Sequence, residues 1–158
     1  MKTNNADDFE DFADPRYVLN RRPLRPGYRL QDTARFDDEN WPLAPASVQE
    51  QERRLTLRFA TVPEPNRTAL KRLCHAMLSA VPPGNAPRPR VSSVTTTFYN
   101  SRVFFRWLDS EYPETRLSEV TPRHLEQYQR HLLSAFASPH RRFALRSSVN
   151  KLWTYRSA

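Results

Sequence analysis

The side chains best suited to chemistry are the cationic groups on the last predicted helix, from Ser138 to about Tyr155. Arg142 and Arg146 are four residues apart, so they share one helical face, and Arg141 flanks them. A guanidinium group donates planar, paired hydrogen bonds to phosphate oxygens. The pattern predicts contact with a polyanion, although a solvated basic face has the same appearance in a sequence.

Two predicted helix starts add further groups that bind phosphate. Ser138 and Pro139 open the last helix, and Ser92 or Ser93 opens an earlier one. The free N–H groups and the positive dipole end at such a start attract anions. The residues predicted to bind nucleic acid are Arg90, Ser93, Thr95, Thr96, Arg102, His140, Arg141, Arg142, Arg146, Asn150 and Lys151.

The overall charge supports a nucleic acid as the partner. The formal net charge is +8 and the isoelectric point is about 10.2. Almost all of the cationic residues are arginines, because Lys2, Lys71 and Lys151 are the only lysines. Selection for phosphate contacts and a GC-rich genome explain this preference equally well.

Several other classes of function are excluded by composition. Gly27 and Gly84 are the only glycines, so no glycine-rich phosphate loop exists. The single cysteine, Cys74, excludes an intramolecular disulfide and a multi-cysteine zinc site, and we expect it to be a buried thiol. No histidine has a partner at metal-ligand spacing, so we expect no metal and no cofactor. The acidic N-terminus is not a secretory signal and no apolar run approaches a membrane span, which favours the cytoplasm.

Two amphipathic helices are predicted between Ser92 and Phe136, and they form the central part of the chain. The first ends near Asp109. The second begins at Thr121, with Pro122 at its first position and with Val120 before the cap able to pack on a leucine inside the helix. The residues expected on the buried faces are Val94, Thr97 or Phe98, Ser101, Phe104, Phe105 and Leu108 in the first helix, and Leu125, Tyr128, Leu132 and Phe136 in the second. The inward face expected for the last helix is Phe143, Leu145, Val149, Leu152 and Trp153.

The two helices carry sequences that resemble a known family. Phe104 to Leu108 read Phe-Phe-Arg-Trp-Leu, and Leu117 to Leu125 read Leu-Ser-Glu-Val-Thr-Pro-Arg-His-Leu. This pattern is similar to the N-terminal core-binding domain of tyrosine recombinases, the phage-integrase family, over roughly residues 90–158. The resemblance implies an all-α, four-helix SAM-like domain that clamps duplex DNA during DNA integration and recombination. It also implies a prokaryotic, nucleoid-associated protein whose partners are duplex DNA and other recombinase protomers, with no small-molecule substrate.

The chain lacks the set of catalytic residues that the family uses. Tyrosine recombinases use an Arg, a Lys, a His-x-x-Arg and a nucleophilic Tyr on a second domain. No histidine of this chain has an arginine three positions later, and Tyr155 stands without those partners. We therefore expect a truncated recombinase or a fragment that binds DNA without being an enzyme.

The sequence as a whole predicts four segments of different character. We expect a disordered or loosely attached tail over 1–40, a helical leader over 41–81, a proline-rich linker over 82–90 and the DNA-binding domain over 91–158. Within the leader, one helix is predicted from Ser47 to Phe59 and another from an Asn66 cap to Val81.

Two other functions fit the same residues. The chain has the composition of a small basic helical module that binds RNA or an acidic protein. The connector from Ser134 to Pro139 also has the length of a helix-turn-helix turn, although it lacks a glycine. Salt-dependent binding of duplex DNA distinguishes the first interpretation from the module.

Overall fold

The computed structural model describes residues 14–48, 55–80, 84 and 86–154, and most of these residues are helical. This confirms a mainly α-helical class. The α-helices are α1 (Arg67–Ser79), α2 (Val91–Glu111), α3 (Pro122–Ala135) and α4 (Pro139–Trp153). Strands β1 (Asn40–Pro42) and β2 (Thr56–Arg58) form an antiparallel pair in which Trp41 lies opposite Leu57. The short 3-10 helices are η2 (Leu30–Asp32), η3 (Ala44–Ala46), η5 (Phe59–Thr61), η6 (Glu64–Asn66) and η7 (Leu117–Glu119).

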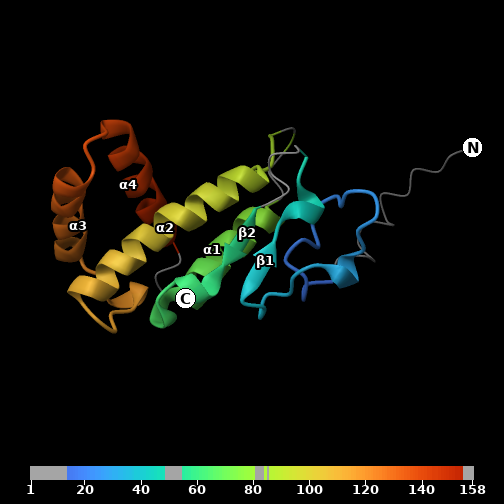
Figure 1. Ribbon diagram of the computed structural model, residues 1–158, viewed down its shortest axis with the longest axis horizontal. Coiled ribbons are helices and arrows are strands. Elements are labelled where there is room, and N and C mark those ends of the chain that lie inside the picture. The colour runs from blue at the N-terminus through green and yellow to red at the C-terminus, as the bar shows by residue number, and fades with distance from the viewer. Residues whose placement is uncertain (1–13, 49–54, 81–83, 85, 155–158) are drawn as a thin grey trace, which may run out of the picture.

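Helix α2 is the central element. It runs diagonally through the molecule in Figure 1, with α3 and α4 towards one end and the strands and residues 14–39 towards the other. It packs against α1, α4 and β2. The face predicted for this helix is buried, and both Thr97 and Phe98 belong to it. The helix therefore presents apolar surface to elements on both sides.

The start of α3 confirms the predicted cap and adds a role for a histidine. Thr121 is the N-cap residue and Pro122 occupies the first helical position. The backbone N–H of Thr121 donates to Nδ1 of His124 at 2.9 Å, which completes a capping box. Val120, directly before the cap, is buried. His124 thus has a structural function at the helix start.

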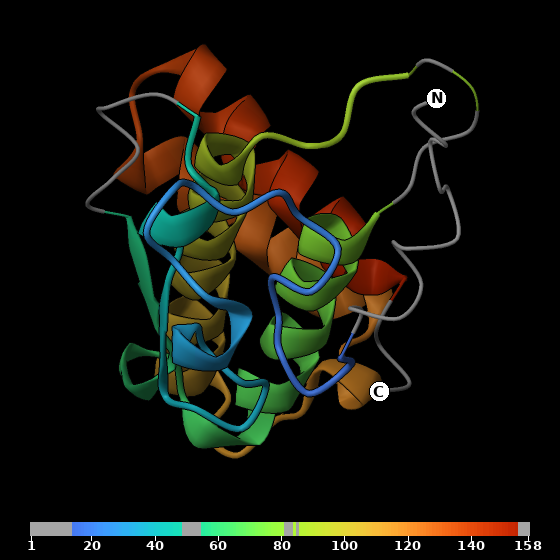
Figure 2. The ribbon, with the colours of Figure 1, turned by 90° about the vertical axis from the view of Figure 1, so that its right-hand side faces the viewer.

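Residues 14–40 differ from the loose tail that the sequence suggested. Val18 and Leu19 are fully buried and belong to the same core as the helices. Arg22 donates hydrogen bonds to the carbonyl oxygens of Leu78 at 2.9 Å and Pro89 at 2.6 Å, so it caps the end of α1. Figure 2 shows this segment, in blue, lying in front of α1 and α2. Residues 1–13 lie outside the described part of the chain.

The predicted helix from Ser47 to Phe59 is wrong where the structure describes it. Residues 49–54 lie outside the described residues, but Thr56–Arg58 forms a strand. Leu57 is buried, whereas Thr56 before it is partly buried and Arg58 after it is exposed, which fits the alternation of a half-buried strand. Pairing with β1 overrides the apparent helical spacing.

The linker does not separate two cores. Residues 86–90 have no regular secondary structure, but Leu70 and Leu78 of α1 share one hydrophobic cluster with Val94 and Phe98 of α2. Helix α1 also packs against α4. The expected leader helix is therefore an integral part of the helical core rather than a separate unit.

Candidate nucleic-acid interface

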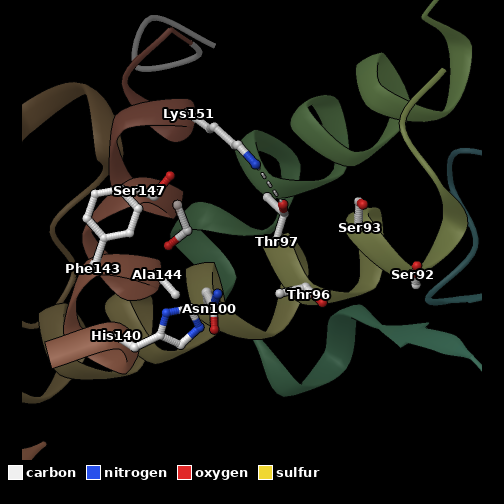
Figure 3. A pocket seen from close by; sticks show the side chains of 11 residues that line it. Ser92, Ser93, Thr96, Thr97, Asn100, His140, Phe143, Ala144, Ser147 and Lys151 are labelled. Atoms are coloured by element: carbon white, nitrogen blue, oxygen red, sulfur yellow. Dashed lines mark hydrogen bonds between the residues drawn. The ribbon is translucent and has the colours of Figure 1, made fainter. Parts of the chain in front are cut away.

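A groove of about 380 Å³ lies between α2 and α4. On α4, its residues His140, Ala144, Ser147 and Lys151 are spaced three or four apart, so one face of that helix forms the wall. Figure 3 shows the two walls, with the imidazole of His140 pointing toward Asn100 of α2. The groove is lined by Ser92, Ser93, Thr96, Thr97, Asn100, His140, Phe143, Ala144, Ser147, Ser148 and Lys151.

Lys151 connects the two walls of the groove. Its Nζ donates to Oγ1 of Thr97 at 3.4 Å, drawn as the dashed line in Figure 3. Thr97 is buried, whereas Lys151 is exposed. An ammonium group has three donors, so Lys151 can keep this contact and still donate to a ligand oxygen.

The surroundings of the groove are strongly cationic. None of the described residues that line it is Asp or Glu. The sequence contains no Asp or Glu at all in residues 65–108 or 127–158, which include α1, α4 and most of α2. The acidic residues that fall between these two stretches belong to the end of α2, the following connection and α3. The groove therefore has a positive field that attracts anions.

The structure brings five of the predicted binding residues together. Ser93, Thr96, His140 and Lys151 line the groove. Arg141 lies at its edge, because its Nη1 donates to Oδ1 of Asn100 at 2.7 Å. The amide of Asn100 is held in place by this bond.

Three other predicted residues lie elsewhere. Thr95 is buried and its hydroxyl donates to the Val91 carbonyl oxygen at 3.1 Å, so it is not available to a ligand. Arg102 donates to Oγ1 of Thr61 at 3.1 Å and packs over Tyr99, away from the groove. Arg90 is the N-cap residue of α2 and lines a separate pocket.

The remaining three lie on the side of α4 that faces α3. Arg142 donates to the carbonyl oxygens of Phe136 at 2.7 Å and Ala137 at 2.9 Å, so it caps the end of α3. Arg146 and Asn150 border a small cavity with residues of α3. Arg146 has no hydrogen bond or ion pair within the described residues. The two arginines share a face, as predicted, but differ in their contacts.

Sequence reasoning missed Phe143 and Asn100. Phe143 was expected to point inward, but it is 65% exposed and lines the groove. The spacing of Leu145, Val149 and Leu152 already carried this signal, because their shared direction on a helical wheel leaves Phe143 on the other side. Asn100 has no sequence signal, since its position depends on the crossing of α2 and α4.

Other chemistry is sparse in the described residues. Cys74 is fully buried, as predicted, and burial raises the pKa of its thiol above the ordinary value. No group of three or more His, Cys, Asp or Glu side chains in residues 14–48, 55–80, 84 and 86–154 could hold a metal ion. None of the described helices is both long enough and apolar enough to cross a membrane. Tyr155 lies outside the described part of the chain.

Comparison of the chain with protein-family models, with curated proteins and with solved structures finds no match in any of the three.

Proposed function

We propose that this chain binds the sugar–phosphate backbone of duplex DNA in the groove between α2 and α4. The observation that carries the proposal is the lining of the groove, which combines a lysine, a histidine, an amide and several hydroxyl groups with no carboxylate among the described residues. Such groups are the usual partners of phosphate oxygens. The net charge of +8 acts in the same direction.

Each wall of the groove contributes donors of a different kind. Lys151 and His140 on α4 supply N–H donors, and Ser93 and Thr96 on α2 supply hydroxyl groups. Helix α2 begins at Val91 without a side-chain cap, so its first N–H groups add a positive end. These contacts position the protein on DNA and do not read the base sequence.

We further propose that the fold is the SAM-like core-binding domain of a tyrosine recombinase, acting in DNA integration and recombination. The family-like segments support this at the level of folding. Phe104 and Leu108 are fully buried, and Thr121 caps α3. Phe104, Leu108 and Thr121, which carry the resemblance, thus stabilise the packing of the helices. The groove residues are the ones proposed to bind the DNA backbone.

Fluorescence anisotropy with a short labelled duplex of arbitrary sequence tests the proposal. We expect a Kd on the order of 10⁻⁴ to 10⁻⁶ M at physiological salt, which weakens as the KCl concentration rises. Lys151→Gln should reduce the salt slope by about one unit, because one phosphate contact is lost.

Arg116→Gln is the matched control. Arg116 is exposed in the acidic connection after α2 and lies outside the groove. This variant removes the same charge and should leave the slope nearly unchanged. Equal effects of both variants on the salt slope would mean that only the net charge matters. If the chain bound an RNA duplex or an acidic protein but not DNA, the proposed partner would be wrong.

A further inference from the structure

Phe143 is an exposed aromatic ring on a helix whose other large apolar side chains are mostly covered. It is 65% exposed, whereas Leu145 and Leu152 are fully buried and Val149 is 5% exposed. Its ring contacts no other aromatic ring of the described residues. Leaving a phenyl ring in water forgoes the free energy that burial would provide. The folded core therefore does not explain its position.

The neighbours of Phe143 identify the kind of surface that the ring belongs to. It lines the same groove as His140, Ser147 and Lys151. In Figure 3 the ring of Phe143 lies at the outer edge of α4, and the side chains of His140 and Lys151 on the same helix extend toward α2, which carries the hydroxyl groups. A flat apolar face thus adjoins a group of hydrogen-bond donors with no carboxylate among the described lining residues. A ligand that matches both parts has a flat ring attached to a negative charge.

We infer that Phe143 is a stacking platform for an unpaired base of DNA, whose phosphate lies on Lys151 and the hydroxyl groups of Ser93 and Thr96. This inference rests on the proposed function, because the same groove holds the backbone. Bases of an intact duplex hide their faces in the helical stack, whereas bases of a gap or branch expose them. The chain should therefore prefer DNA that contains unpaired bases to a fully paired duplex.

The test compares three labelled DNAs by anisotropy: an intact duplex, the same duplex with a short single-stranded gap, and the gapped duplex with abasic sites in the gap. Stacking of one base corresponds to roughly tenfold tighter binding. We expect the gapped duplex to bind about tenfold more tightly than the intact one, and the abasic gap to lose this advantage.

Three variants locate the effect. Phe143→Leu, which keeps an apolar side chain without an aromatic ring, should abolish the preference for the gap, measured as the ratio of the Kd values for the intact and gapped duplexes in the same variant. Phe143→Tyr should retain the preference. Leu133→Ala is the control, because Leu133 is a 67% exposed apolar residue of α3 that does not line the groove.

The outcomes separate the two proposals. Equal binding of the intact and gapped duplexes, or a preference that survives in Phe143→Leu or with the abasic gap, overturns the stacking inference and leaves duplex binding standing. A chain that binds neither DNA overturns the proposed function together with the inference.

Discussion

Asn66 holds Leu117 in place across the core, although the two residues are distant in sequence. Its Oδ1 accepts a hydrogen bond from the Leu117 N–H at 2.7 Å, and its Nδ2 donates to the Thr115 carbonyl oxygen at 2.9 Å. Asn66 occupies the N-cap position of α1 but its side chain makes no capping bond there. The amide instead joins α1 to the connection between α2 and α3.

Replacing Asn66 should therefore destabilise the whole chain. Asn66 is only 3% exposed, so Asn66→Ala leaves the buried N–H of Leu117 and the partly buried carbonyl oxygen of Thr115 without partners. We expect a loss of about 1–3 kcal/mol in the free energy of unfolding, measured by urea denaturation. Thr68→Ala, at an exposed position of α1, is the control and should change little. A denaturation midpoint equal to that of the parent would show that the two bonds contribute nothing.

The buried face of α2 predicts a larger effect. Phe104 and Leu108 are fully buried, so truncation of either side chain to alanine leaves a cavity. Each substitution should cost roughly 2–5 kcal/mol. Leu133→Ala, at a 67% exposed position, should stay within about 0.5 kcal/mol of the parent. Thermal melts that do not distinguish the three variants would contradict the packing of α2.

Arg142 and Arg146 should differ in their effect on stability. Arg142 donates to two carbonyl oxygens at the end of α3, whereas Arg146 is exposed and has no such bond within the described residues. Arg142→Ala should lower the free energy of unfolding by about 1–2 kcal/mol, because it removes two charge-assisted bonds at a partly exposed site. Arg146→Ala should leave it nearly unchanged. The same loss in both variants would argue against the capping role.

The buried thiol of Cys74 predicts a dependence of stability on pH. Burial raises its pKa, so only the unfolded chain ionises at moderately alkaline pH. The contribution of the buried Cys74 thiol to the free energy of unfolding is fully present below the ordinary thiol pKa, about 8.5. It declines as the pH rises beyond that value, because the unfolded chain then loses the thiol proton. Urea denaturation of the parent and of Cys74→Ala between neutral and alkaline pH measures the difference. A parent whose stability follows that of the variant at every pH would contradict the burial of the thiol.

We also expect no covalent chemistry on DNA. Strand cleavage by a tyrosine needs several cations around the scissile phosphate, and the sequence has no His-x-x-Arg to supply them. Nicked duplexes that trap covalent intermediates should give no protein–DNA adduct on a denaturing gel. An adduct that disappears in Tyr155→Phe would identify Tyr155 as a nucleophile and contradict this expectation.

The amino-acid sequence alone determined the features that depend on neighbouring residues. The starts of α3 at Thr121–Pro122 and of α4 at Ser138–Pro139 were predicted correctly, because a cap needs only a polar side chain and the next turn. The buried stripe of α2 followed from its period for the same reason. The shared face of Arg142 and Arg146 on α4 was also visible as helical spacing.

Tertiary structure decided the features that depend on residues far apart in the chain. Arg22 was predicted to lie in a loose tail, yet its side chain donates to the carbonyl oxygen of Leu78 and so caps the end of α1, which is far from Arg22 in the sequence. Thr56–Arg58 became a strand because β1 offers it a partner. The basic residues were divided between capping, as at Arg142, and the groove, as at Lys151, by the packing of α3 and α2 on α4. Local periodicity records which face of an element is apolar, but the free energy that selects its partner comes from contacts that form only when the whole core is assembled.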